Sequence, residues 1–222
     1  PFLDYKFLHE LNDGRLKRLA DSAAMVFRTG FDKAMKNSSG EGTVLEFGVF
    51  KGGSMVWIAD GITKRYPKVS YVGFDSWEGL PEETRGVWAP PRHGKGKWAT
   101  TKDIPLKKLK DRGLENDPRF RFVDGFYEDS LTPEVRKGIS NLTFVNIDVD
   151  IHSSTMSVLR FLRPILKAGV VLYFDDWKDP IDKNDAEWGE HLAWKEFTNQ
   201  NPDLKWSILC TNSANQRCLE IE

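Results

Sequence analysis

Five short apolar segments, four of them with an acidic residue at or just beyond their end, constrain the fold of this 222-residue chain. Between several of them lie stretches whose apolar residues recur every three or four positions, which is typical of amphipathic helices. Short strands that alternate with helices form parallel βαβ units, and helices cover both faces of the resulting sheet. We therefore predict an α/β fold with a Rossmann-like, doubly wound and mostly parallel sheet. The expected strands cover residues 43–47, 69–74, 119–123, 142–147 and 170–174, and the expected helices include 54–62 and 155–167.

The length of the chain indicates one domain. At roughly 150 residues per domain, the chain corresponds to about 1.5 domains, and no linker separates two halves. Residues 5–36 have apolar positions at helical spacing and predict two short helices with a break at 12–14. Residues 82–111 lack periodicity, and long loops of this kind are usually functional or disordered. The expected organisation is a single domain over 1–222, with a helical cap at 1–40, a core at 41–222 and a substrate or lid loop at 82–111.

The composition excludes several classes of partner. Lys and Arg number 32 and Asp and Glu number 33, so the net charge of −1 offers no broad basic face to nucleic acid. Apolar runs such as 169–174 are far shorter than the roughly 20 residues of a membrane-spanning helix, so no membrane partner is expected. Two cysteines, Cys210 and Cys218, are too few to cross-link a chain of this length, which favours reduced thiols and a cytoplasmic location.

A glycine-containing turn follows the first expected strand. Such a turn lets the backbone approach a ligand closely, and the next helix directs its free amides toward that ligand. The segment is not the G-x-G-x-x-G motif of dinucleotide enzymes, because Phe50 stands in place of the second glycine. Glu46, two residues before Gly48, disfavours a pyrophosphate and suits a ligand that carries an ammonium and a sulfonium. Asp75, at the end of the second strand, is placed to bind ribose hydroxyls, which favours a nucleoside ligand over an ordinary turn and a capping aspartate.

Four carboxylates follow the fourth and fifth expected strands. Asp148 and Asp150 come after one strand and Asp175 and Asp176 after the next, so neighbouring parallel strands bring them together. Carboxylates that close need a cation, and ligation by oxygen alone favours Mg²⁺, with Mn²⁺ or Ca²⁺ as alternatives. Such an ion can lower the pKa of a bound hydroxyl while a nearby carboxylate takes the proton. Asp150 is the candidate base because it alternates in direction with Asp148 if the strand persists; the alternative is that it caps a helix.

Four sequence blocks resemble a known family. The chain is similar to class I S-adenosylmethionine-dependent methyltransferases, and within them to the metal-dependent sugar O-methyltransferases typified by macrocin O-methyltransferase. The likeness spans 44–177, with three departures from the family pattern: His152 replaces a tyrosine, Thr132 replaces a proline, and the loop at 88–98 follows no family pattern. The matching blocks are 46–53 (E-x-G-V-x-x-G-G), 75–81 (D-S-F-x-G-L-P), 125–131 (G-W-F-x-D-T-L) and 148–155 (D-x-D-x-Y-x-S-T) with a later D-D at 175–176.

The resemblance implies a fold, a reaction and a set of site residues. It implies the class I methyltransferase fold and methylation of a hydroxyl of a sugar or small natural product, and it leans toward a homodimer or larger homo-oligomer. Glu46 and Gly48 would face the methionine part of the cofactor, Asp75 the ribose and 124–126 the adenine, with Asp150 as the general base. The expected cofactor-binding residues are Glu46, Gly48, Val49, Phe50, Lys51, Gly52, Ser54, Asp75, Ser76, Asp124, Gly125, Phe126 and Asp148, and the expected Mg²⁺ ligands are Asp148, Asp175 and Asp176.

Several alternatives stay open at this point. His152 is a second candidate catalytic residue, and either it or His191 could act as base in place of Asp150. Trp88 and Trp98 could stack on a sugar or an aromatic acceptor, or form a solvated lid tip. Within the same fold, an N-methyltransferase or a metal-independent methyltransferase is the nearest alternative function. More distant alternatives are a metal-dependent phosphohydrolase, a nicotinamide oxidoreductase and a non-catalytic cofactor-binding module.

Overall fold

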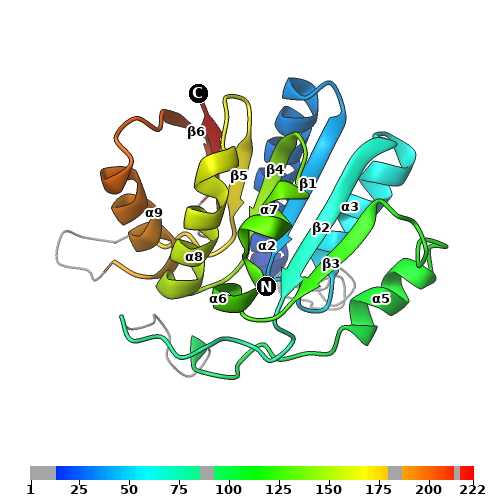
Figure 1. Cartoon of the computed structure of the whole chain (residues 1–222), viewed down its shortest axis with the longest axis horizontal. Coiled ribbons are helices and arrows are strands. Elements are labelled where there is room, and N and C mark those ends of the chain that lie inside the picture. The colour runs from blue at the N-terminus through cyan, green and yellow to red at the C-terminus, as the bar shows by residue number, and fades with distance from the viewer. Residues whose placement is uncertain (1–13, 86–92, 180–186, 213–215) are drawn as a thin grey trace.

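A seven-stranded sheet forms the centre of the protein (Figure 1). The structure is a computed structural model that describes residues 14–85, 93–179, 187–212 and 216–222. The strand order is β3-β2-β1-β4-β5-β7-β6, in which the first five are parallel and the last two run antiparallel to their neighbours. This order confirms the predicted α/β, mostly parallel sheet. The strands are β1 (Glu41–Phe47), β2 (Lys68–Asp75), β3 (Phe120–Asp124), β4 (Leu142–Ile147), β5 (Val171–Phe174), β6 (Trp206–Thr211) and β7 (Arg217–Ile221).

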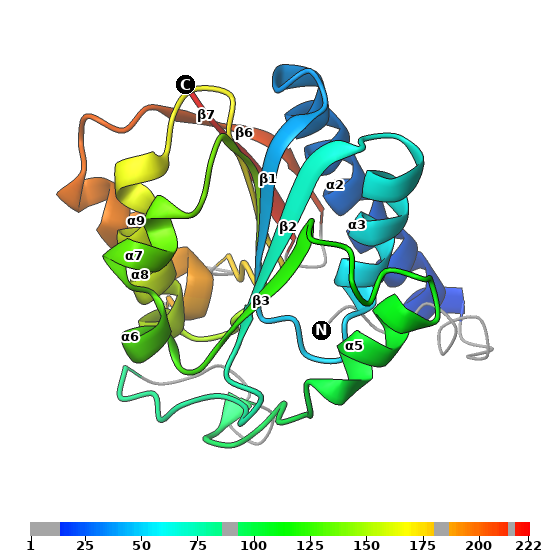
Figure 2. The ribbon, with the colours of Figure 1, turned by 45° about the vertical axis from the view of Figure 1, so that its right-hand side comes forward.

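Helices cover both faces of the sheet. Figure 2 shows α2, α3 and α5 on one face and α6, α7, α8 and α9 on the other. A cluster of buried apolar side chains lies between the sheet and each helical layer. The helices are α2 (Gly14–Asn37), α3 (Gly53–Lys64), α5 (Asp103–Lys110), α6 (Tyr127–Ser130), α7 (Pro133–Lys137), α8 (His152–Leu162) and α9 (Gly189–Gln200), and a short 3-10 helix (Arg163–Ile165) follows α8.

The central strands are buried on both faces, which explains why their sequences are mostly apolar. Every residue of β4 is buried. In β1, Leu45 and Phe47 face the cluster under α8 and α9, whereas Val44 faces the cluster under α2 and α3. Glu46 is the exception in this strand, because its carboxylate is fully buried on the α3 side.

In the part that the structure describes, the N-terminal region forms the second of its two predicted helices. The predicted break at 12–14 coincides with the start of α2 at Gly14, and the first predicted helix lies outside the described residues. The helix α2 packs on β4, β5, β6 and β7, with Phe27 and Phe31 fully buried against Phe144. The described part of the expected cap is therefore a layer of the core.

Three regions have regular structure that the sequence patterns did not indicate. The predicted loop at 82–111 contains α5, a short helix with only two buried residues, Pro105 and Leu109. The helices α6 and α7 have four and five residues, too few to show a helical period. The strands β6 and β7 form an antiparallel pair at the edge of the sheet, where each residue of β6 is exposed or half-buried.

The helix predicted at 155–167 is present as α8, but both of its ends lie earlier in the sequence than predicted. It begins at His152 and ends at Leu162, and the 3-10 turn that follows contains Pro164. A proline cannot donate a backbone hydrogen bond and its ring clashes with the preceding turn of an α-helix, so it accounts for the early end.

Candidate active site

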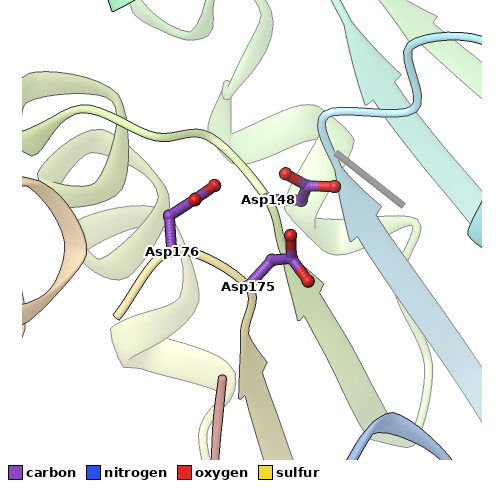
Figure 3. A group of neighbouring side chains, drawn as sticks. All are labelled: Asp148, Asp175 and Asp176. Carbon is purple, nitrogen blue, oxygen red and sulfur yellow. The ribbon is translucent and has the colours of Figure 1, made fainter. Parts of the chain in front are cut away.

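The carboxyl ends of β4 and β5 lie side by side and carry three aspartates. The amide of Asp148 donates to the Phe47 carbonyl, and that of Asp175 donates to the Ile147 carbonyl, both at 3.0 Å. Asp148, Asp175 and Asp176 each direct one carboxylate oxygen into a common space, where these oxygens lie within 4.8 Å of one another (Figure 3). The structure therefore brings together the three residues predicted to hold a metal ion.

The chemistry of this cluster fits a hard divalent cation. Desolvation raises the pKa values of Asp148 and Asp176 well above their usual range, and the charges of the neighbouring aspartates raise them further. The Oδ2 atom of Asp176 is buried and accepts no hydrogen bond from the residues that the structure describes. A buried acceptor without a donor costs free energy that a bound cation would recover. Three oxygen ligands are the donor set expected for Mg²⁺ or a similar ion.

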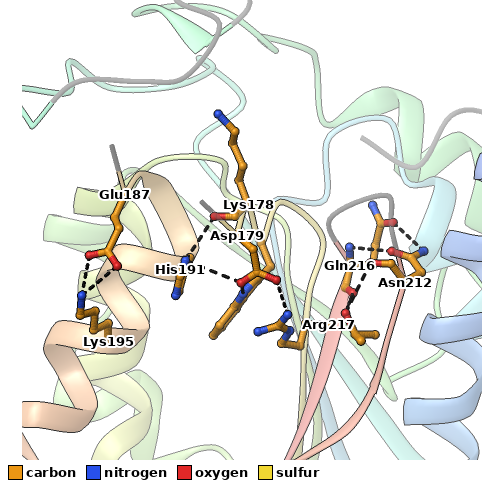
Figure 4. A network of polar contacts seen from close by, with 10 residues as sticks. Lys178, Asp179, Glu187, His191, Lys195, Asn212, Gln216 and Arg217 are labelled. Carbon is orange, nitrogen blue, oxygen red and sulfur yellow. Dashed lines mark hydrogen bonds and ion pairs between the residues drawn. The ribbon is translucent and has the colours of Figure 1, made fainter. Parts of the chain in front are cut away.

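Asp175 is held by its own strand and by the edge of the sheet. The Tyr173 hydroxyl donates to Asp175 Oδ1 at 2.5 Å, and Gln216 Nε2 donates to the Asp175 carbonyl at 2.9 Å. Beyond it, Asp179 accepts a hydrogen bond from Trp177 and pairs with Arg217 (Figure 4). The loop after β5 is thus tied to β7, which fixes the direction of the Asp175 side chain.

Asp150, the predicted base, is buried but does not continue the strand. The strand β4 ends at Ile147, and Asp150 has a φ of 60° in the left-handed region. The reason for which it was chosen, alternation along the strand, is therefore wrong, although the residue still lies beside the cluster. His93 Nε2 lies 3.0 Å from Asp150 Oδ1, and both side chains are less than a tenth exposed. Asp150 thus sits between the aspartate cluster and a histidine from the loop after β2.

The sequence reasoning missed two residues at this site, His93 and Glu190. His93 lies in an irregular segment whose sequence carries no period, so no local signal marked it. Glu190 is fully buried at the start of α9, where Ala193, Trp194 and Phe197 form the buried face. A carboxylate in register with an apolar helical stripe was a signal that could have been found, because an unpaired charge is rarely placed there.

The glycine turn brings the end of β1 against the end of β4. Gly48 has a φ of 86°, and a Cβ atom there would lie 1.9 Å from the Asp148 carbonyl oxygen. Phe50 also has a left-handed φ of 50°, and its amide donates to Asp75 Oδ2 at 2.7 Å. Asp75 Oδ1 accepts a second amide, that of Trp77, at 2.7 Å. Asp75 thus holds the glycine turn in place from the end of β2.

Glu46 lies beneath this turn in a pocket of hydrogen-bond donors. Its carboxylate accepts hydrogen bonds from the Ser54 and Tyr71 hydroxyls and, at 2.9 Å, from Asn146 Nδ2. Burial raises the pKa of Glu46 from 4.5 to about 7, against the lowering effect of these three donors. Glu46 and Ser54, both predicted to bind the cofactor, are therefore in direct contact at the start of α3.

The other predicted cofactor residues lie around the ends of β2 and β3. Asp75 and Asp124 are neighbours in the register of these strands. Asp124 accepts hydrogen bonds from Lys102 Nζ at 2.7 Å and Trp77 Nε1 at 2.9 Å. The Ser76 hydroxyl donates to the Gly79 carbonyl at 3.2 Å. After β3, the Gly125 amide donates to the Asp75 carbonyl, and Phe126 directly precedes α6.

The remaining predicted residues belong to the glycine turn after β1. Val49 is buried, Lys51 is exposed with its Nζ over the Phe50 ring, and Gly52 is the N-cap of α3.

The two histidines considered as bases have other partners in the structure. His152 Nε2 lies 2.9 Å from Glu196 Oε2, and Arg85 donates to the other oxygen of Glu196 at 2.6 Å. His191 stacks on Trp177, with ring centroids 5.0 Å apart, and its Nδ1 lies 3.2 Å from the Lys178 carbonyl (Figure 4). A catalytic role for His152 stays a prediction.

Comparison with known proteins identifies the family. A family model described as macrocin-O-methyltransferase (TylF) matches residues 15–201. The chain belongs to the macrocin O-methyltransferase family. It is therefore an O-methyltransferase, and the matched region contains the glycine turn and all the clustered aspartates. No curated protein sequence matches this macrocin O-methyltransferase family member.

Solved structures share its fold at low sequence identity. Calicheamicin methyltransferase CalS11 is 21% identical with a TM-score of 0.66, over 95% of this chain and 80% of that one. The O-methyltransferase NovP is 20% identical with a TM-score of 0.65, over 92% and 79%. The SAH-bound methyltransferase PaMTH1 from Podospora anserina is 12% identical with a TM-score of 0.54, over 99% and 86%. Within the described part of this family member, no helix combines the length and the apolar character needed to cross a membrane.

Proposed function

We propose that the protein transfers the methyl group of S-adenosylmethionine to a hydroxyl of a sugar or small natural product, with Mg²⁺ bound by Asp148, Asp175 and Asp176. The observation that carries this proposal is the convergence of these three carboxylates next to the glycine turn. The family membership supports the reaction, and the SAH-bound relative supports the cofactor. One relative, CalS11, is described as a TDP-rhamnose 3'-O-methyltransferase, which supports a sugar as acceptor.

The residues of the glycine turn would bind the cofactor in three places. Glu46, in its pocket of donors, would accept the ammonium of the methionine part, since an ionised carboxylate is the natural partner of that group. Asp75 has both oxygens directed at backbone amides, and a carboxylate has about four acceptor sites, so it can still accept from a ribose hydroxyl. Gly48 has no side chain, so the sulfonium would approach the backbone between β1 and β4.

The aspartates after β4 and β5 would prepare the acceptor. A Mg²⁺ ion bound there would lower the pKa of a hydroxyl coordinated to it. Asp150 would take the proton, and His93, 3.0 Å from it, would hold the carboxylate in place. The ring of Trp98 lies near those of His93 and Phe50, with centroid distances of 6.4 and 5.7 Å, and would form an aromatic wall for the acceptor.

Substitution of the metal ligands tests this proposal. In Asp148→Asn and Asp175→Asn we expect loss of turnover with every hydroxyl acceptor. Asp175 is not among the predicted cofactor-binding residues, so Asp175→Asn should retain binding of S-adenosylhomocysteine, measured by calorimetry. Asp203→Asn, an exposed carboxylate that pairs with Arg163, is the matched control and should keep full activity. Wild-type activity that persists unchanged in excess EDTA would contradict the role of the metal.

A further inference from the structure

The first turn of α9 contacts both loops that carry the aspartate cluster. Glu190 accepts a hydrogen bond from the Val149 amide at Oε1, at 3.3 Å, and from the Asp176 amide at Oε2, at 2.9 Å. Val149 follows Asp148 directly, so one carboxylate links the loop after β4 to the loop after β5. The side chain has no exposed surface, so solvent does not replace either bond.

Gly189, the residue before Glu190, also packs closely against the loop after β4. Gly189 has a φ of 50°, and a Cβ atom there would lie 2.4 Å from the carbonyl oxygen of Asp150. The backbone of α9 therefore meets the loop after β4 at van der Waals distance, which only a glycine permits. This contact is independent of the Glu190 hydrogen bonds and joins the same two elements.

The remainder of α9 fixes this turn to the core. Trp194 is almost fully buried and its ring lies 5.6 Å from that of Phe174, the last residue of β5. Phe197, one turn further on, packs in the same cluster. A side chain at the start of such a helix has little freedom to move, and this is the property required of a group that sets the spacing of two loops.

We propose that Glu190 is a positioning residue that holds Asp148 and Asp176 at the spacing needed to bind a divalent cation. This inference rests on the metal site of the proposed function. Both oxygens of Glu190 are directed at backbone amides, so it acts through the two loops. Groups that orient metal ligands in this way typically change metal affinity 10- to 100-fold when they are altered.

Two substitutions separate position from charge. Glu190→Gln keeps the shape of the side chain, but it has only one acceptor oxygen, whereas the Val149 and Asp176 amides each need an acceptor. Glu190→Asp keeps the charge but is shorter by one methylene and cannot reach both amides. Glu187→Gln is the control, because Glu187 lies just before α9 and pairs with Lys195 at 2.8 Å (Figure 4).

The measurement is the affinity for Mn²⁺, by electron paramagnetic resonance, with S-adenosylhomocysteine affinity measured in parallel. We expect Mn²⁺ to bind 10- to 100-fold more weakly to both Glu190 variants, with cofactor affinity unchanged and the control like wild type. Normal Mn²⁺ affinity in Glu190→Asp would show that only the charge matters and would overturn the inference. Wild-type protein that binds no Mn²⁺ would instead overturn the proposed function, and the inference with it.

Hydrogen exchange gives a test that needs no variant. The Val149 and Asp176 amides of the wild-type protein should exchange slowly because Glu190 accepts from both, and in folded Glu190→Gln at least one should exchange faster. Rapid exchange of both amides in the wild type would overturn the inference even if the Glu190 variants do not fold.

Discussion

Glu46→Gln should make the stability of the protein less dependent on pH. Glu46 has no exposed surface, and burial raises its pKa from 4.5 to about 7. In the variant, the amide oxygen can accept from Ser54 and Asn146, and the Tyr71 hydroxyl can turn to accept from the new amide group. The substitution therefore removes one titration from the core with little change of shape.

The size of the effect follows from linkage. The folded state binds the Glu46 proton more tightly than the unfolded state, so this group stabilises the fold fully below pH 4.5 and loses that contribution as the pH rises to about 7. At about 1.4 kcal/mol for each tenfold change in proton affinity, the total is on the order of 3 kcal/mol. Most of this contribution is lost between pH 5 and pH 8, and Glu46→Gln should not show that loss.

Urea unfolding of the protein without cofactor or metal measures this directly. The free energy of unfolding is determined for wild type and Glu46→Gln at pH 5 and at pH 8, and the difference between the two proteins is compared. This comparison cancels the titration of the aspartate cluster, which both proteins share. Glu128→Gln, at an exposed position, is the control and should follow wild type.

A constant difference between wild type and Glu46→Gln at the two pH values would refute the reasoning. It would mean that the three donors around Glu46 offset its burial and that the carboxylate ionises as it does in water.

Further predictions concern the contacts of the site. Gly48→Ala should destabilise the fold by at least about 2 kcal/mol more than Gly96→Ala in thermal unfolding, because both have a positive φ but only Gly48 meets a backbone oxygen, at 1.9 Å. His93→Ala should lower kcat about 10- to 100-fold, with cofactor affinity unchanged, because it removes a buried partner of Asp150; an unchanged kcat would contradict this. Cofactor affinity measured by calorimetry should increase as the pH rises to about 7, because only the ionised Glu46 accepts an ammonium, and Glu46→Gln should abolish this dependence.

The parallel part of the sheet could be predicted because its signals are local. A strand buried on both faces has a mostly apolar sequence, and the predicted strand at 142–147 coincides with β4. The acids at the ends of these strands could be placed at one edge from topology alone. The antiparallel pair β6 and β7 lacked such a signal, because β6 is exposed along much of its length and its pairing depends on the edge of a sheet already formed.

The three aspartates of the proposed metal site could be predicted from the sequence, but the residues that support them could not. Asp148, Asp175 and Asp176 follow strands that are neighbours, so their meeting is a consequence of strand order. The contact of His93 with Asp150 depends on the path of an irregular segment, which has no period to reveal it. Glu190 bridges two loops from a third element, so its role is visible only once all three are placed.

Two groups of buried carboxylates lie at one edge of this sheet, and the chain stabilises them differently. Glu46 has three donors from its own chain, so it can remain buried without a ligand, at the cost of a pKa near neutrality. Asp176 has its amide bound by Glu190, while its Oδ2 accepts no hydrogen bond from the described residues. A buried carboxylate oxygen that is held in position but given no donor is what the proposed cation site requires, because a bound cation would recover the free energy that the missing donor costs. The distribution of hydrogen-bond donors, more than the number of acids, therefore separates the proposed metal site from the proposed cofactor site.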